Sequence, residues 1–513
     1  MKTLKDSVTM RWLMLVLLSG LTFATYWAQD FMGGIKDILM NEYGFTSENF
    51  GRVVGMTTWT NMIGMIIVGG IILDKWGIRI AGLIFGALAA LGATVVFLAS
   101  IGLFGEDSGT RLLMMGIGRM LFGSGLEVVC VVATRTIVKW FKGYEMALAM
   151  GLNIGFGRLG TALGIAISPD IAFGSTVSAS FGFAASLIGL ALIMFVVYLF
   201  FDVRIDKQLA ADKPPTEKDD FKFADFLNLI KDKSFIYITL LCVAFYAAYF
   251  PFIQYAPDML VNKFGFSSEL PANAPVVMAS NPALGNALIF VGLFLFVIFF
   301  SVVPSNLKTA IQRLVVRLAV LAGFVFYIYH FRELFGVWLH NGPKTAALIP
   351  LGTIVFTPVF GAIIDKKNRA ATLMIIGSFL LILAHLSLSV LNNVTLAYVG
   401  LFSLGIAFSL VPAAMWPSVA KIVPENRLGT AYSTMFTVQN WGLGIFYWGI
   451  GWLLDVVNRS KLDAIERGEA VYDYTVPVLV LVACGVVSIF LAFKLKQADR
   501  KAGYGLEEPP AKH

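Results

Sequence analysis

The chain has 513 residues, of which 58% are hydrophobic and 14% are charged, and its net charge is +7. Soluble globular proteins carry about 25% charged residues, so this composition excludes a large soluble domain and indicates a protein that crosses a membrane many times. The positive charge does not indicate a nucleic-acid partner, because the basic residues lie in short loops on one side of the apolar runs, as membrane orientation requires.

Fourteen apolar runs in the sequence are long enough to cross a bilayer as helices, which takes roughly 20 residues each. Six precede a polar linker and lie near residues 12–29, 51–73, 80–104, 111–136, 147–168 and 180–201. Eight follow the linker, near residues 234–261, 285–304, 311–330, 345–364, 370–390, 395–415, 429–455 and 475–495. We expect an all-α integral membrane fold with an N-terminal six-helix half at residues 1–201 and a cytoplasmic linker at residues 202–233.

Lysine and arginine are concentrated in alternate loops. The N-terminal segment has Lys2, Lys5 and Arg11, and seven basic residues lie between Arg204 and Lys233. The opposite loops are poorer in basic residues, and the richly charged one among them, residues 455–473, is net acidic. Because lysine and arginine mark the cytoplasmic side and the number of spans is even, we expect both termini in the cytoplasm.

A short motif occurs twice, at the end of a corresponding span in each part of the chain. The first copy consists of Gly70, Asp74, Lys75, Gly77 and Arg79, and the second of Gly361, Asp365, Lys366 and Arg369. Glycine permits close helix approach, aspartate can face the positive end of a neighbouring helix, and the basic residues lie at the lipid headgroups. The duplication predicts two halves related by an internal repeat, in which these residues have gating or structural roles.

Three charged residues lie deep within the apolar spans at 111–136 and 147–168, away from the span ends: Arg119, Glu127 and Arg158. A charge at mid-membrane depth costs about 3 kcal/mol on insertion scales, so each marks a candidate functional site. Glu127 and Arg158 are expected at equal depth on adjacent helices. They can form a structural salt bridge, bind the two ends of a zwitterion, or pair when empty and open for a ligand. Arg119 is expected to be a structural or gating residue, with Asp30 as its partner.

The second part of the chain offers aromatic and amide side chains rather than charges at this depth. The candidates are Tyr246, Tyr255, Trp416, Gln439 and Asn440, joined by Tyr26 from the first span. Such a wall suits a peptide bond and varied side chains, although each aromatic residue can also serve ordinary helix packing. Other polar or reactive residues in the spans are expected to be packing residues: His385, Cys130, Cys242 and Cys484.

Through the duplicated aspartate motif the chain is similar to the major facilitator superfamily, in which two six-helix halves rock about a site at the midplane. Within that superfamily it resembles the lysosomal-type dipeptide transporter branch at residues 118–127 (GRMLFGSGLE), 140–145 (WFKGYE), 416–420 (WPSVA) and 428–432 (LGTAY). The resemblance implies that Glu127 and Arg158 hold the two termini of a dipeptide. The chemistry agrees, because a guanidinium matches a carboxylate and a carboxylate accepts from an ammonium.

The superfamily core has twelve spans, so two of the fourteen predicted here are additional. The run at 345–364 directly precedes the second motif copy and is therefore expected to be core span eight. We expect core span seven at residues 234–262, an inserted two-helix hairpin with outer loops at 263–344, and core spans eight to twelve with a cytoplasmic tail at 345–513. The hairpin is expected to be a peripheral addition facing lipid or a partner, with a gating role as the alternative.

These observations favour a transporter of dipeptides that works by rocker-switch alternating access as a uniporter. The alternatives are a proton-coupled symporter of peptides or organic anions, and a non-transporting membrane scaffold on the same fold. We expect neither an enzyme nor a metal or cofactor, because the sequence has no histidine cluster, nucleophile–base spacing or metal motif. The expected partners are the dipeptide substrate and the lipid bilayer, and an accessory membrane protein remains open.

Few glycosylation sequons lie in the outer loops, and the short termini carry no sorting signal of the acidic dileucine type. A cell membrane or bacterial inner membrane is therefore favoured, with the lysosomal membrane as the alternative.

Overall fold

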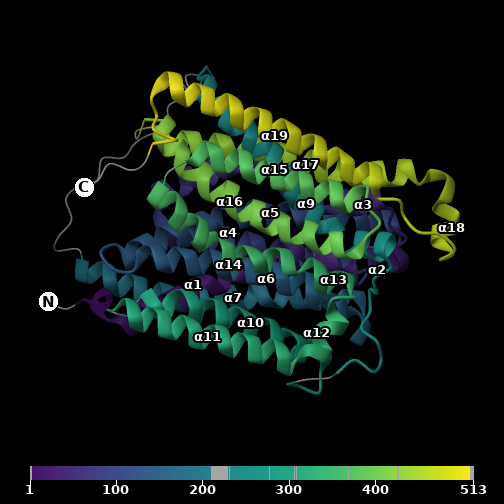
Figure 1. Ribbon diagram of the computed structural model, residues 1–513. Coiled ribbons are helices and arrows are strands. Elements are labelled where there is room, and N and C mark those ends of the chain that lie inside the picture. Colours follow the sequence, from purple (N-terminus) through teal and green to yellow (C-terminus); the bar gives the residue numbers. More distant parts are fainter. Residues whose placement is uncertain are drawn as a thin grey trace.

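The computed structural model describes residues 3–209, 229, 231–275, 278–305, 307, 309–367, 369–424 and 427–508. These residues form long helices that run side by side, with both chain ends at one end of the molecule (Figure 1). We call this end the terminal side and the other end, where α2, α12 and α18 lie, the far side. The described residues form no β-strand, and a single isolated bridge joins Ser267 to Asn341.

The N-terminal half consists of six long segments of helix and several short connections. Its elements are η1 (Leu4–Asp6), α1 (Val8–Asp30), η2 (Phe31–Ile35), α2 (Lys36–Tyr43), α3 (Ser47–Met62), α4 (Met65–Ser100), α5 (Ser108–Phe141), α6 (Met146–Gly174) and α7 (Val177–Leu209). The predicted linker begins within α7, and its residues 210–228 and 230 lie outside the described residues.

In the described residues after the linker, there are eight further long helices. Its elements are α9 (Lys233–Phe264), α10 (Pro282–Ser305), α11 (Ala310–His330), α12 (Arg332–Trp338), α13 (Gly342–Ala346), α14 (Leu348–Lys367), α15 (Ala370–Ser389), α16 (Val394–Ile422), α17 (Leu428–Val457), η5 (Arg459–Lys461), α18 (Leu462–Glu466) and α19 (Thr475–Ala502). The division of the chain into domains at the predicted boundaries stays a prediction.

Local sequence signals set many of the helix ends. Asp107, Asp232 and Asn393 precede α5, α9 and α16, and each side chain accepts a hydrogen bond from a backbone N–H of the first turn. Such caps satisfy donors that have no partner inside the helix. Gly265 and Gly503 end α9 and α19 with φ of +71°, a left-handed conformation that glycine adopts without strain.

The second and third predicted spans are divided differently in the structure. A break at Ile63 and Gly64 separates α3 from α4, and α4 then continues past Gly77, where φ is +78° and the backbone is not helical. Among the described residues, eleven helices are long and apolar enough to cross a membrane. The all-α membrane fold is confirmed, while the count of fourteen spans stays a prediction.

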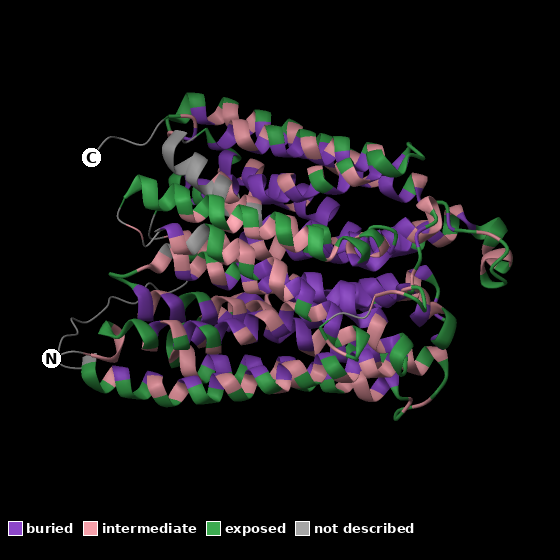
Figure 2. Cartoon of the chain, turned by 60° about the horizontal axis from the view of Figure 1, so that its bottom comes forward, coloured by how far each residue is buried: buried purple, intermediate pink, exposed green. Residues whose placement is uncertain are grey.

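The helices enclose a core formed by their inner faces, whereas their outer faces carry intermediate and exposed residues (Figure 2). Close approach between helices depends on small residues. A Cβ added to Gly160 of α6 would lie 2.3 Å from the backbone oxygen of Phe23 in α1, so only glycine fits there. This contact fixes α6, and with it Arg158, against the first helix.

The duplicated motif is only partly described. Asp74 forms a 2.5 Å ion pair with Arg135 of α5, and Arg79 forms one of 2.6 Å with Asp202 of α7. The expected close helix approach at Gly70 is wrong, because nothing would lie within 4 Å of a Cβ there, and the space beside it is open. Lys75 is exposed, and Arg369 directly precedes α15. The side chains of Gly361, Asp365 and Lys366 lie outside the described residues.

Candidate functional site

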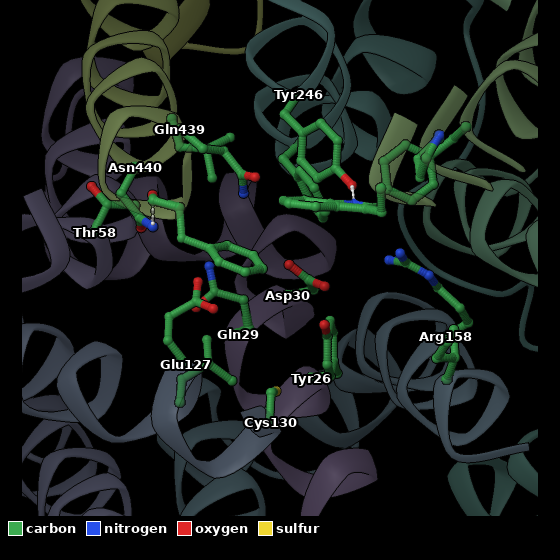
Figure 3. A pocket seen from close by; sticks show the side chains of 18 of the residues that line it. Tyr26, Gln29, Asp30, Thr58, Glu127, Cys130, Arg158, Tyr246, Gln439 and Asn440 are labelled. Atoms are coloured by element: carbon green, nitrogen blue, oxygen red, sulfur yellow. Dashed lines mark hydrogen bonds between the residues drawn. The ribbon is translucent and has the colours of Figure 1, made fainter. Parts of the chain in front are cut away.

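A cavity of about 480 Å³ lies between the two halves. It is lined by α1, α3, α5 and α6 on one side and by α9, α14, α16 and α17 on the other. Seven of the eight predicted substrate-binding residues line it: Tyr26, Glu127, Arg158, Tyr246, Trp416, Gln439 and Asn440. The structure therefore brings together residues that are up to about 400 positions apart in the sequence (Figure 3).

Glu127 and Arg158 lie on opposite sides of this cavity (Figure 3). Neither forms an ion pair with any residue in the described part of the chain. The Arg158 guanidinium lies 4.6 Å from the centre of the Phe408 ring and 5.8 Å from that of Tyr26, and both rings can hold a cation on their faces. The structural salt bridge considered from the sequence is thus not formed here, and each charge faces a space that a ligand can occupy.

The second half contributes a wall of aromatic rings. Trp416 donates a 2.9 Å hydrogen bond from Nε1 to the Tyr246 hydroxyl, and its ring stacks on Phe436 with centroids 4.8 Å apart. Phe408 stacks on Tyr249 with centroids 3.6 Å apart. These contacts hold the rings in fixed positions, so the wall is preformed rather than assembled by a ligand.

The amide side chains of Gln439 and Asn440 differ in which hydrogen-bonding groups already have a partner. Asn440 donates a 2.9 Å hydrogen bond to the backbone oxygen of Phe436, and Gln439 accepts one of 3.3 Å from Cys242. Gln439 therefore keeps its amide N–H groups for a ligand, and Asn440 keeps its carbonyl oxygen. Cys130 also lines the cavity as a free thiol, in contrast to its expected packing role.

Tyr255 was expected in the cavity and lies elsewhere. It is buried, its hydroxyl donates a 3.0 Å hydrogen bond to the backbone oxygen of Tyr447, and its ring packs against Phe50. It sits where α3 and α17 close against each other, farther along α9 than the residues that face the cavity. Its role in this structure is packing between the halves.

Arg119 has a different partner from the one predicted. Its guanidinium donates to the backbone oxygens of Ala28 at 2.6 Å and Gln29 at 3.0 Å. These carbonyls lie at the end of α1, where the chain passes into the 3₁₀ turn η2 and the usual helical acceptor pattern is lost. Arg119 thus stabilises the end of the first helix at membrane depth, a structural role, but not through Asp30.

Asp30 joins the two halves at the far end of the cavity. It accepts hydrogen bonds from Thr161 of α6 at 2.6 Å and from Gln254 of α9 at 2.8 Å. Gly33 lies so near that a Cβ there would be 3.0 Å from the Gln254 backbone. The end of α1 therefore forms the far wall of the cavity.

Beyond this wall, three carboxylates bind donors of the other half, and we call these contacts the far-side gate. Asp258 of α9 pairs with Lys36 at 2.6 Å, and Asp170 of α6 pairs with Lys344 at 2.8 Å. Asp455 of α17 accepts from the first backbone N–H groups of α3 at 3.2 Å and 2.7 Å. Within the described residues, the hydrogen bonds between halves all lie from mid-depth to the far side. The cavity is thus closed on the far side.

Other residues considered from the sequence take no part in the site. His385 is fully buried, with Nδ1 2.9 Å from the backbone oxygen of Leu381. Cys242 and Cys484 are free thiols in the spans, as expected. In the part of the chain that the structure describes, no group of three or more histidine, cysteine, aspartate or glutamate residues could hold a metal ion.

The family model of the Major Facilitator Superfamily matches residues 18–338, 275–447 and 330–510, which together cover most of the chain. The chain belongs to the major facilitator superfamily. It is therefore a multi-pass membrane transporter and not an enzyme, as the sequence predicted.

Relatives in sequence support the predicted resemblance to the lysosomal-type dipeptide transporter branch. The Lysosomal dipeptide transporter MFSD1 of Danio rerio is 24% identical over 463 residues, covering 87% of this chain and 81% of the relative. The protein of the same name from Homo sapiens is 24% identical over 462 residues, covering 87% of this chain and 80% of the relative. The resemblance to the dipeptide transporter branch is thus confirmed as a relationship in sequence.

Solved structures of other superfamily members share the fold. The nucleoside transporter NupG aligns with a TM-score of 0.60 at 14% identity, over 94% of this chain and 99% of that one. A bacterial homologue of the human lysosomal transporter Spinster, in an inward-facing and occupied conformation, aligns with a TM-score of 0.57 at 12% identity, over 97% and 98% of the two chains. At these identities the likeness concerns the fold alone.

Proposed function

We propose that the protein moves dipeptides across a membrane as zwitterions. The observation that carries the proposal is the placement of Glu127 and Arg158 on opposite sides of one cavity, without an ion pair between them. A free dipeptide carries an ammonium at one end and a carboxylate at the other. Glu127 accepts from the ammonium and the Arg158 guanidinium binds the carboxylate, and both contacts are stronger inside a cavity than in water.

The remaining cavity surface suits the middle of a dipeptide. The amide of Gln439 donates to the peptide carbonyl, and the carbonyl of Asn440 accepts from the peptide N–H. The wall of Tyr246, Phe408 and Trp416 packs against side chains of different sizes without selecting one, because aromatic faces tolerate many apolar partners. A monocarboxylate fits less well, since Glu127 would repel it.

The transport cycle we propose is rocker-switch alternating access, with the two halves as moving parts. The far-side gate supports this, because it consists of polar contacts that can separate when the halves tilt. With the termini in the cytoplasm, as the loop charges predict, the closed far side is the outside and the cavity faces inward. The Glu127–Arg158 site would then be reached alternately from each side.

We propose uniport rather than proton coupling. The ligand's own charges neutralise Glu127 and Arg158, so the cycle needs no proton for the binding step. Proton symport is the second candidate, and Asp30 favours it: this carboxylate is 2% exposed and, among the described residues, is hydrogen-bonded to the neutral Thr161 and Gln254.

The test is uptake of a labelled dipeptide into proteoliposomes that contain the purified protein. We expect saturable uptake that unlabelled free dipeptides compete for, whereas dipeptides acetylated at the amine or amidated at the carboxylate do not. A proton gradient should leave the final internal concentration unchanged. Accumulation driven by the gradient would establish symport instead, and competition by capped peptides as strong as by free ones would refute the zwitterion site.

The cellular membrane is a separate proposal. The sequence favours a cell membrane or bacterial inner membrane, whereas the relatives above carry a lysosomal name. Fractionation of the source cells, with the protein followed by an antibody, decides between the two. Copurification in the same experiment tests for an accessory membrane protein.

A further inference from the structure

The inserted hairpin is not a purely peripheral addition. Its first helix, α10, packs along α6 of the N-terminal half as well as against α11 and α14. At the far side, Asn286 of α10 donates a 2.8 Å hydrogen bond to Oδ2 of Asp170. Closer to mid-depth, Phe294 of α10 packs edge to face against Phe156 of α6 with ring centroids 5.3 Å apart. The hairpin therefore contacts the opposite half at two levels.

Asp170 is bound by the second half from two directions. Lys344 of α13 donates to Oδ1 at 2.8 Å and also to the backbone oxygen of Ala166 at 3.0 Å, while Asn286 donates to Oδ2. All three side chains of this cluster are at most 7% exposed. A buried ion pair is stable only when its remaining acceptor sites are also satisfied, and Asn286 satisfies the second oxygen.

The hairpin is fixed to the second half on the same side. Phe290 of α10 stacks on Trp338 of α12 with centroids 4.6 Å apart, and the Trp338 backbone oxygen accepts a 3.0 Å hydrogen bond from Thr345 of α13. Lys344, the residue that directly precedes Thr345 in α13, carries the charge that binds Asp170. Asn286 and Lys344 are thus held by one connected group of contacts and move together relative to α6.

The corresponding position in the other half has no such addition. Asp170 lies near the far-side end of α6, the fifth span of its half, and binds the start of the second core span of the other half. Asp455 lies near the far-side end of α17, the equivalent span, and binds the start of α3. The two carboxylates are related by the internal repeat, but only Asp170 receives a donor from an inserted helix.

We propose that the hairpin is a working part of the far-side gate, in which Asn286 stabilises the Asp170–Lys344 pair and favours the state closed on the far side. This role rests on the alternating access proposed above. When the halves tilt apart, Asp170 and Lys344 enter water and no longer need Asn286. Loss of Asn286 therefore destabilises the closed state relative to the open one.

The test uses Cys130 as a reporter, because its thiol lines the cavity. In a protein with Cys242→Ser and Cys484→Ser, Cys130 is the sole cysteine. A membrane-impermeant maleimide applied on the far side of sealed vesicles of known orientation labels it only when the far-side gate opens. We expect Asn286→Ala to raise the labelling rate roughly tenfold, as for the loss of one hydrogen bond to a charged group. Asn286→Asp should raise it further, since it places a second carboxylate beside Asp170.

Two controls separate the possible outcomes. Tyr327→Phe removes a hydrogen bond inside the hairpin, to the backbone oxygen of Ile289, and should leave the rate unchanged. Asp455→Asn weakens the gate without touching the hairpin and should raise the rate. If Asp455→Asn raises labelling while both Asn286 variants match the parent protein, the hairpin is not part of the gate, although alternating access stands. If no variant raises labelling, both the gate and the alternating access of the proposed function are refuted.

Discussion

The proposed contact between Arg158 and the dipeptide carboxylate can be tested by exchanging Arg158 for lysine. The exchange keeps the positive charge but removes the planar fork that binds both carboxylate oxygens. It also removes the guanidinium from the face of Phe408, 4.6 Å away, which holds it in position without a ligand. A hydrogen bond to a charged group contributes about 1.5–3 kcal/mol, so we expect a loss of about 2 kcal/mol in binding free energy. This corresponds to a roughly thirtyfold weaker affinity, since about 1.4 kcal/mol is tenfold.

The measurement is isothermal titration of the purified protein with a free dipeptide, supported by the ligand-induced rise in melting temperature. Glu127→Gln, which keeps the shape of the side chain but not its charge, should weaken binding by a similar factor. Arg135→Lys is the matched control, because Arg135 pairs with Asp74 at the protein surface and does not line the cavity. If Arg158→Lys binds a free dipeptide as tightly as the parent protein, the guanidinium does not hold the peptide carboxylate and the proposed clamp is wrong.

Three further predictions test structural contacts outside the cavity. Arg119→Leu leaves two buried carbonyls without a donor and should lower stability by about 2–4 kcal/mol, measured by chemical unfolding; a parent-like curve would contradict its structural role. Gly160→Ala should lose about 1–3 kcal/mol through overpacking against α1, whereas Gly151→Ala, with open space around it, should not. Burial raises the pKa of Glu507, but hydrogen bonds from Thr372 and Lys496 outweigh it and the pKa lies below its usual value. Glu507 accepts a 2.8 Å hydrogen bond from the Thr372 backbone N–H and pairs with Lys496 at 3.0 Å, which docks the segment after α19 onto α15. This docking should be intact at neutral pH and weaken as the pH falls through the lowered pKa, which would expose the segment to an acid-active protease. Equal protection at all pH values would refute this.

The positions of the spans follow from a local property of the sequence, the length of an apolar run. The structure places helices at every predicted run for that reason. The break at Ile63 and Gly64 was missed because both residues are common within membrane helices, and only the φ of +96° at Gly64 reveals the turn. Composition alone therefore does not distinguish a single span from an apolar run that contains an internal turn.

The charged residues of the cavity were predictable because a charge inside an apolar run is rare and expensive. Phe408 was missed, since a phenylalanine in an apolar span carries no such signal, although it lies beneath Arg158. Two assignments were incorrect: Tyr255 does not line the cavity, and Arg119 does not pair with Asp30. Both depend on the rotation of a helix about its axis and on the residues that face it from neighbouring helices. That information belongs to the packing between helices and not to any one of them.

Two groups of charges at the interface between the halves perform different tasks. Those of the far-side gate are paired across the halves, as in Lys36 with Asp258 and Lys344 with Asp170, so they stabilise one arrangement of the halves. Glu127 and Arg158 have no ionic partner among the described residues, so water or a ligand must compensate their charges. Closing the terminal side over an empty cavity would remove that water and leave both charges uncompensated, which costs several kcal/mol per ion. In the proposed function, a zwitterion supplies both partners at once, so the loaded protein can close where the empty one resists. The pattern of pairing would then link the binding of a dipeptide to the movement of the halves.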